Sequence, residues 1–260
     1  MTSETSTLVS LHGVDVPVVR RGSGPPILVL HGGEGLVDHL PFAERISSNF
    51  ELLHPTHPGF DGTPIPEHFD GLEDLTFLYL DLIDSLDLQD AILVGFSMGG
   101  WLAAEMAVMC SHAFSKLMLV DAVGIKPQQG EIADIFIISP TEVTALAYHD
   151  PKQAPEYDQL YGQTPTPEQV TIAEGNREMT VRLCWKPYMY DLRLPQLLGR
   201  VNIPTRIVWG REDQIVPAEC AQLYHQAIPG SDLVIIDNCG HVPQVEKPDE
   251  FVKTALEFMA

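Results

Sequence analysis

The sequence predicts an α/β fold: a mostly parallel sheet of eight strands, flanked by helices and carrying an inserted helical cap. Two patterns indicate this. Short, almost wholly apolar stretches alternate along the chain with amphipathic ones, and the alternation stops between about residues 125 and 195. Continuous apolar strands are typical of parallel strands that helices cover on both faces. A length of 260 residues suits one large domain with an insertion.

The expected strands are short and rich in branched apolar residues. The first two form a pair that turns at His12-Gly13. In chain order the eight strands are Leu8–Leu11, Val14–Arg20, Ile27–Leu30, Phe50–His54, Ala91–Val94, Leu117–Val120, Arg206–Trp209 and Leu233–Ile236.

The expected helices lie between these strands and show a 3.6-residue apolar period. In Leu72–Leu86, leucines recur at helical spacing, while Glu73, Asp74, Asp81 and Asp84 occupy the opposite face. The full set is Leu40–Ser48, Leu72–Leu86, Trp101–Met109, Ala218–Ala227 and Asp249–Met259.

Residues 125–195 contain helix-like sequence rich in Pro, Gln and Tyr. They follow the strand that ends near Asp121 and precede the strand pattern that resumes after Ile203. We therefore divide the chain into a core of residues 1–124 and 196–260 and an inserted helical cap, or lid, of residues 125–195.

The formal net charge is −21, and no basic run occurs. Such a surface repels nucleic acid and anionic membranes, so neither is expected as a partner. The polar N-terminus predicts no signal peptide, and no apolar run approaches the ~18 residues of a membrane span. The scattered cysteines at 110, 184, 220 and 239 are typical of free thiols in a cytoplasmic protein and form no zinc pattern.

Gly95-Phe96-Ser97-Met98-Gly99-Gly100 joins a buried strand to a helix. A serine in a tight turn has a purely structural interpretation, but this G-x-S-x-G pattern in a strand–turn–helix setting is typical of an exposed nucleophile. The flanking glycines leave room for the turn. Ser97 is the candidate nucleophile, and it needs a base to remove its proton.

A base and an acid are expected after later strands. His241 follows the last strand, in Asn238-Cys239-Gly240-His241, and Asp213 follows Arg206–Trp209. A carboxylate beside the histidine orients the ring and stabilises its charged form. Asp121, at the end of an earlier strand, is the rival acid. We favour Asp213, with Glu212 pointing away from the site.

The glycine-rich loop His31-Gly32-Gly33-Glu34-Gly35 follows the strand Ile27–Leu30. Its backbone can approach a ligand closely, and it lacks the patterns of dinucleotide or P-loop phosphate sites. We expect the N–H groups of Gly33 and Met98 to form an oxyanion hole. Gly32 and Glu34 would border the substrate, and Glu34 would disfavour anionic substrates.

Taken together, these motifs resemble the α/β-hydrolase superfamily, in its capped bacterial branch of serine hydrolases. The resemblance covers nearly the whole chain: His31-Gly32-Gly33, Pro58-Gly59-Phe60, the Ser97 turn, Trp209 to Asp213, and Gly240-His241 to Pro248. The order Ser97, Asp213, His241 is the chain order of that superfamily's catalytic triad. The serine motif is similar to those of both carboxylesterases and hydrolases of carbon–carbon bonds.

Three residues depart from the pattern of relatives, namely Thr56, Asp61 and Thr63. Val242 after the histidine favours the esterase branch, because carbon–carbon bond hydrolases usually have Trp there. His54 and His57 are three residues apart, but prolines between and after them argue against a metal site and for a surface loop.

In the cap, Trp185 and Tyr188 are the expected substrate-binding residues, within a mainly apolar site over Ser97. Arg177 and Arg182 are the cations that a substrate carboxylate would need. The sequence thus predicts a serine esterase, or a lactone or amide hydrolase, acting on a small molecule without metal or cofactor, as a monomer or homodimer. A carbon–carbon bond hydrolase of ring-fission diketone acids is the enzymatic alternative. A hydrolase-like ligand receptor is the alternative from another class.

Overall fold

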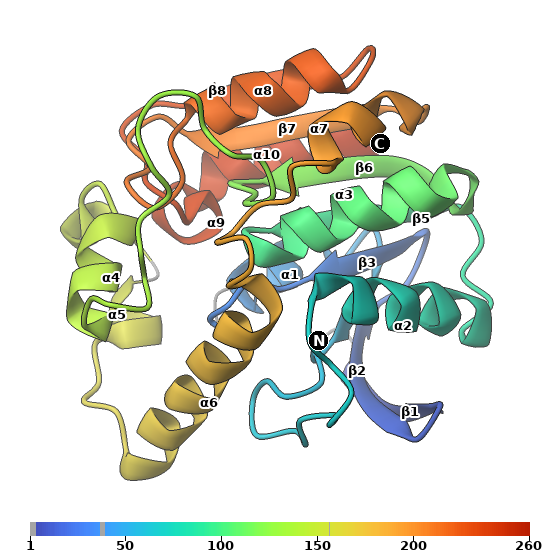
Figure 1. The fold of residues 1–260 in the computed structure, drawn as a ribbon, viewed down its shortest axis with the longest axis horizontal. Coiled ribbons are helices and arrows are strands. Elements are labelled where there is room, and N and C mark those ends of the chain that lie inside the picture. Colours follow the sequence, from blue (N-terminus) through green and yellow to red (C-terminus); the bar gives the residue numbers. More distant parts are fainter. Residues whose placement is uncertain (1–3, 37–39, 156) are drawn as a thin grey trace.

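A computed structural model describes residues 4–36, 40–155 and 157–260. Its centre is an eight-stranded sheet with the order β1-β2-β4-β3-β5-β6-β7-β8 (Figure 1). β2 pairs antiparallel with β1 and β4, and the strands from β4 to β8 are parallel. The strands are β1 (Glu4–Leu11), β2 (Val14–Gly22), β3 (Pro26–Leu30), β4 (Glu51–Pro55), β5 (Ala91–Phe96), β6 (Phe114–Val120), β7 (Thr205–Gly210) and β8 (Asp232–Ile236).

Ten α-helices are assigned among the described residues. Short 3₁₀ turns follow α3 and α7 and precede α5. The helices are α1 (Leu40–Ile46), α2 (Leu72–Ser85), α3 (Met98–Cys110), α4 (Pro140–Ala147), α5 (Tyr157–Tyr161), α6 (Pro167–Cys184), α7 (Leu194–Leu197), α8 (Glu219–Ala227), α9 (Pro243–Glu246) and α10 (Pro248–Met259).

Helices cover both faces of the sheet, as the apolar strands predicted. Side chains alternate along a strand, so Leu28 and Leu93 pack on the side of α2, α3 and α8, while Val29 and Val94 face α1 and α10. In α2 the buried residues are those with helical spacing in the sequence, from Leu72 to Ile83. The predicted fold class is confirmed.

The parallel strands end at one edge of the sheet, and their loops meet there. Ser97 follows β5, Asp121 follows β6, Asp213 lies just beyond β7, and His241 lies just beyond β8. In such sheets this edge is where ligands bind. Residues far apart in sequence therefore become neighbours only when the sheet assembles.

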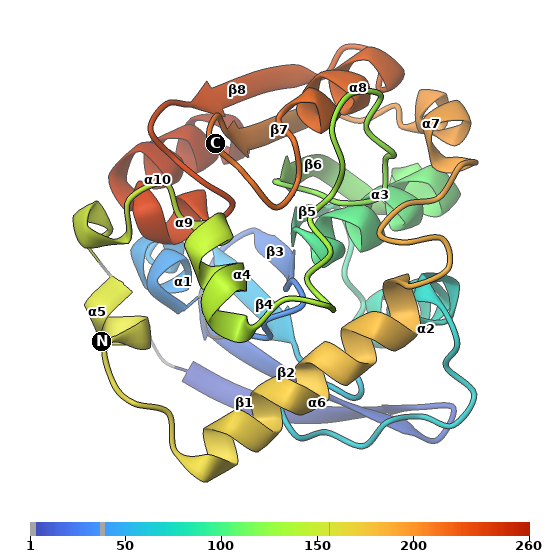
Figure 2. The same ribbon diagram turned by 60° about the vertical axis from the view of Figure 1, so that its left-hand side comes forward.

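Helices α4, α5 and α6 lie between β6 and β7 in the chain and stand at this edge of the sheet (Figures 1 and 2). Where this segment leaves and rejoins the sheet, the Gly124 N–H donates to Met189 O at 2.8 Å and the Asp191 N–H donates to Gly124 O at 3.0 Å. The expected segment of helices is present. The division into core and cap at residues 125 and 195 stays a prediction.

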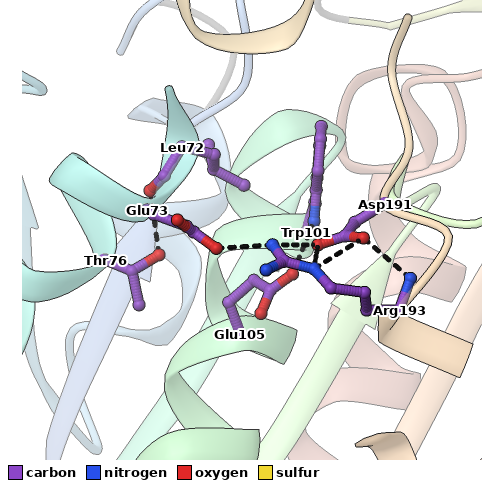
Figure 3. A network of polar contacts seen from close by, with 7 residues as sticks. All are labelled: Leu72, Glu73, Thr76, Trp101, Glu105, Asp191 and Arg193. Carbon is purple, nitrogen blue, oxygen red and sulfur yellow. Dashed lines mark hydrogen bonds and ion pairs between the residues drawn. The ribbon is translucent and has the colours of Figure 1, made fainter. Parts of the chain in front are cut away.

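A polar network secures the returning chain to the helical layer (Figure 3). The Arg193 guanidinium contacts the carboxylates of Asp191 and Glu73, which joins the end of the 125–195 segment to α2. Beside it on α3, the Trp101 indole N–H donates to the buried Glu105 carboxyl at 3.1 Å. The end of the 125–195 segment is thus held by ionic contacts as well as by backbone hydrogen bonds.

One expectation about the fold is wrong. The segment containing His54 and His57 is not a surface loop, since every residue from Leu52 to Phe60 is buried. The His57 ring is hydrogen-bonded to the Tyr79 hydroxyl at 2.5 Å and packs against the His31 ring, with centroids 3.7 Å apart. These imidazoles find partners in a polar layer beneath the glycine-rich loop, which the sequence pattern did not indicate.

No helix in the described part of the chain combines the length and apolar character needed to cross a membrane.

Candidate active site

Ser97 occupies a strained turn between β5 and α3. Its backbone has φ 50° and ψ −115°, a region that residues with a side chain rarely adopt. A Cβ at Gly95 would lie 2.2 Å from Gly99 O, and one at Gly99 would lie 2.2 Å from Leu30 O. Only glycine fits at these two positions, so the sequence pattern directly reflects the tightness of the turn.

His241 lies within hydrogen-bond distance of both Ser97 and Asp213. Its Nε2 is 3.0 Å from Ser97 Oγ, and its Nδ1 is 2.7 Å from an Asp213 carboxylate oxygen. The Asp213 carboxylate accepts a hydrogen bond from the ring, so the ring proton lies on Nδ1. The unprotonated Nε2 then faces the serine as a base. The structure brings the three predicted residues together in one hydrogen-bonded chain.

Asp213 is held in place by its own turn. Its other carboxylate oxygen accepts from the N–H groups of Ile215 and Val216 at 2.8 and 2.9 Å, and the side chain is completely buried. Glu212 points elsewhere, as expected, and accepts from the Cys239 N–H at 2.9 Å. Adjacent carboxylates therefore have separate roles: one orients the His241 ring, and the other orients its loop.

His31 determines how the glycine-rich loop faces Ser97. The His57 N–H donates to His31 Nε2 at 3.0 Å, so the ring proton sits on Nδ1 and donates to Gly32 O at 2.7 Å. Burial lowers the His31 pKa to about 4, which keeps the ring neutral. In a trans peptide the N–H points opposite to the C=O. Holding the Gly32 carbonyl against His31 therefore turns the Gly33 N–H away from that ring.

Gly32 lies directly against the nucleophile. A Cβ at Gly32 would be 3.1 Å from the Ser97 Cβ. On the other side, α3 begins at Met98, so the Met98 N–H is in the first helical turn and has no acceptor within the helix. The two predicted N–H donors, of Gly33 and Met98, thus come from segments that flank Ser97. Their role as an oxyanion hole stays a prediction.

Helix α6 also contacts the glycine-rich loop. On α6, the buried Asn176 side chain accepts from the Asp61 N–H at 2.7 Å and donates to the Asp61 carboxylate at 2.9 Å and to Glu34 O at 3.2 Å. The Asp61 carboxylate in turn accepts from the Leu36 N–H at 3.2 Å. Asp61 was noted in the sequence only as a departure from relatives, and Asn176 was missed because nothing near it in sequence marks it.

Glu246 is a second residue whose role the sequence did not show. Its buried carboxylate accepts from the N–H groups of Gly240, His149 and Asp150, at 2.6, 3.2 and 2.7 Å. These amides belong to the His241 loop and to the chain after α4. A single side chain therefore connects the chain after α4 to the loop that carries the histidine.

Glu34 is exposed to water yet lies close enough to His241 and Arg177 for their charges to act on it. Partial desolvation by the surrounding protein raises the pKa of its carboxyl, while His241 and Arg177 act in the opposite direction. The Arg177 guanidinium donates to the carbonyls of Phe136 and Ile138 at 2.7 and 2.9 Å. Arg182 is exposed on the same helix.

Trp185 and Tyr188 line a pocket of about 340 Å³ on the cap. None of Ser97, Asp213 and His241 belongs to its lining, which includes Lys126, Glu131 and Tyr190. Trp185 is 51% exposed, and the Tyr188 hydroxyl is engaged with the backbone of Ala133 and Ile135. The structure places these two residues in one pocket, and their substrate-binding role stays a prediction.

A serine on a strand-to-helix turn, facing a histidine and an aspartate at the edge of a mostly parallel sheet, defines a hydrolase of the α/β class. The chain belongs to the Alpha/beta hydrolase family, whose model matches residues 27–254.

Two relatives indicate the range of activities in this family. Monoacylglycerol lipase ABHD6 of Homo sapiens is 26% identical over 269 residues, which is 93% of this chain and 77% of the lipase. The 2-hydroxy-6-oxo-2,4-heptadienoate hydrolase of Pseudomonas putida is 24% identical over 99% of this chain and 97% of its own length.

Solved structures share the fold. A serine hydrolase involved in carbazole degradation (CarC) superposes with a TM-score of 0.78 at 20% identity and covers 99% of both chains. The naproxen esterase of Bacillus subtilis also gives 0.78, at 16% identity, over 100% of this chain and 92% of its own.

Proposed function

We propose that this protein is a serine hydrolase that cleaves a carboxylic ester or lactone of a small, mainly apolar substrate through an acyl-enzyme on Ser97. The observation that carries this proposal is the hydrogen-bonded chain from Ser97 Oγ through His241 to Asp213. It begins at a nucleophile held in a strained turn.

In acylation, His241 Nε2 takes the proton of Ser97 as Oγ bonds to the substrate carbonyl carbon. Such general-base help is worth about 10² to 10⁴ in rate. The carbonyl oxygen becomes an oxyanion, which the Gly33 and Met98 N–H groups stabilise, and removal of one such donor typically costs about 3–4 kcal/mol. His241 then gives its proton to the leaving alcohol as the bond between carbon and alcohol oxygen breaks.

In deacylation, a water molecule gives a proton to His241 Nε2, and its oxygen bonds to the acyl carbon. The proton returns to Ser97 Oγ as the ester bond to the enzyme breaks, which releases the acid and restores the starting state. Asp213 stays ionised throughout and stabilises the transient imidazolium.

The charges near Ser97 support a neutral substrate over an acidic one. Glu34 places a carboxyl group within electrostatic range of His241. Arg177 is the nearby cation, but its guanidinium already donates to two carbonyls of the cap. A substrate carboxylate at this site would therefore meet an acidic group and a cation that is already engaged.

Carbon–carbon bond hydrolysis of ring-fission diketone acids is the second candidate. The match to the heptadienoate hydrolase favours this candidate, because it spans 97% of that hydrolase but only 77% of the lipase. This reaction would use the same serine, histidine and aspartate, with Arg177 as the contact for the acid. Val242 and the carboxyl of Glu34 weigh against it.

Nitrophenyl esters of increasing acyl length test the proposal, measured for burst and steady-state release beside Ser97→Ala. Steady turnover that peaks at one acyl length and vanishes in Ser97→Ala is the expected result. Turnover of a ring-fission diketone acid with little ester cleavage would favour the second candidate. A folded protein that turns over once, slowly, and keeps its product bound would support a ligand receptor instead.

A further inference from the structure

Asp121, the rival acid of the sequence, lies beside the predicted triad without replacing Asp213. A carboxylate oxygen of Asp121, one of Asp213 and a ring nitrogen of His241 lie within 4.8 Å of one another. Asp121 follows β6, is 1% exposed, and has the positive φ of 44°. Two buried carboxyl groups thus share one small space beside a single histidine.

The hydrogen bonds of the two acids differ. Asp213 accepts from three donors: the His241 ring and the N–H groups of Ile215 and Val216. Asp121 accepts from one, because its Oδ1 takes the Gly210 N–H at 2.9 Å. Its Oδ2 is buried and finds no donor among the described residues. Donors stabilise the ionised form, so Asp213 is the better place for a negative charge.

We propose that Asp121 is a neutral carboxylic acid whose Oδ2 proton is donated to the Asp213 carboxylate, and that it thereby positions Asp213 against His241. This proposal deepens the proposed function and rests on it for its kinetic part. Two adjacent buried carboxyls cannot both ionise without a large electrostatic penalty, and one proton between them removes it. With this proton, the Asp121 Oδ2, which otherwise has no partner among the described residues, becomes a hydrogen-bond donor.

The other groups around Asp121 favour the neutral form. Glu246 on α9 adds a negative charge, and the neighbouring Cys239 thiol has its pKa raised by burial and by the acids around it. The nearby His241 ring is already paired with Asp213, and the Gly210 N–H, which favours the ionised form of Asp121, contacts Oδ1. Burial and the Asp213 charge raise the pKa of the Asp121 carboxyl well above its ordinary range.

Infrared spectroscopy tests the protonation without any substrate. The C=O stretch of a protonated carboxyl is expected in the wild type at pH 7–8 and is expected to be weaker in Asp121→Asn. Since Glu34 and Glu105 also have raised carboxyl pKa values, the difference between these two proteins isolates Asp121. Identical carboxyl bands in the two folded proteins would overturn the proposal, whether or not esters turn over.

The pH profile of kcat/KM separates a neutral Asp121 from an ionised one by sign. Asp121→Val keeps a branched side chain but removes the donor, so Asp213 attracts the imidazolium proton more strongly and the acidic limb moves to higher pH. If Asp121 were ionised, the same change would remove a negative charge and move that limb to lower pH. The second outcome overturns the proposal.

Rescue by the amide completes the test. The Asn amide can accept from Gly210 and donate to Asp213, as a protonated acid does. We expect Asp121→Val to lose at least about tenfold in kcat/KM, and Asp121→Asn to recover most of that loss with the wild-type acidic limb. Equal losses in both variants, with both folded, would show that the neutral donor is not what Asp121 supplies.

Discussion

The backbone N–H of His241 donates a hydrogen bond of 2.7 Å to the carbonyl of Ala147. Ala147 ends α4 in the segment between β6 and β7, so the candidate base is joined directly to that inserted segment. Gly240 makes this contact possible, because a Cβ there would lie 2.4 Å from the same carbonyl. Glu246 strengthens the connection from the other side.

Removing Glu246 is therefore expected to harm catalysis as well as stability. Glu246→Gln replaces one acceptor with an N–H₂ group that faces backbone donors, which costs about 1–3 kcal/mol of unfolding free energy. We expect kcat to fall about tenfold or more, because the His241 loop loses its hold. Thermal unfolding and ester kinetics measure both effects, with exposed Glu257→Gln on α10 as the control. An unchanged kcat in Glu246→Gln would contradict the positioning role.

The Ser97–His241 contact makes a second prediction. Ser97→Ala and His241→Ala should each lower kcat by ~10⁴-fold or more, and the double variant should be little worse, since residues that act as a unit are not additive. Melting temperatures should stay near that of the wild type. Ser48→Ala, at an exposed serine, is the matched control. A double variant that is slower by the product of the two single losses would mean that the residues act independently.

Glu34 should set the preference for substrate charge. Removing the negative charge by Glu34→Gln is expected to raise kcat/KM for esters that carry a carboxylate by about three- to tenfold, with neutral esters of equal length little changed. The effect should shrink in high salt, because the site is open to water. Glu174→Gln, on the exposed part of α6, is the control. Equal responses of charged and neutral esters would remove Glu34 from the specificity argument.

Buried histidines predict how stability varies with pH. Burial lowers the pKa of His31 to about 4 and that of His54 to about 3, from 6.5. Below pH 6.5 these histidines are protonated in the unfolded chain but not in the folded chain. Each histidine therefore lowers the free energy of unfolding by up to about 1.4 kcal/mol per pH unit as the pH falls toward its folded pKa. Stability from these groups is present above pH 6.5 and is lost below it.

His54→Leu tests this dependence, because His54 Nε2 has no hydrogen-bond partner among the described residues. Between pH 6.5 and 4.5, the free energy of unfolding of the variant should fall less steeply with decreasing pH than that of the wild type. The difference in slope should correspond to the uptake of up to one proton, about 1.4 kcal/mol per pH unit. Urea unfolding at several pH values measures it, with exposed His68→Gln as the control. Since Glu34, Glu105 and Asp121 have raised carboxyl pKa values and act in the opposite direction, the comparison is between variant and wild type. An unchanged slope would contradict the prediction.

Much of the candidate site could be predicted because its signals are local. A Cβ at Gly95 or Gly99 would collide with backbone atoms, so the glycines next to Ser97 indicate the tight turn in the sequence itself. Each strand is short and apolar enough to be located, and Asp213 and His241 stand just beyond strands that the pattern marks. The strand order, in contrast, depends on which apolar edges meet.

The sequence alone determined the fold class and the candidate nucleophile, base and acid, since these follow from periodicity and from steric demands within a few residues. The tertiary structure decided which distant groups meet. It placed Asn176 and Asp61 against the glycine-rich loop, joined Glu246 to the His241 loop, and put Asp121 beside Asp213. Such contacts are set by packing between segments more than 80 residues apart, as for Asp121 and Asp213, or by loops whose course the local pattern leaves open.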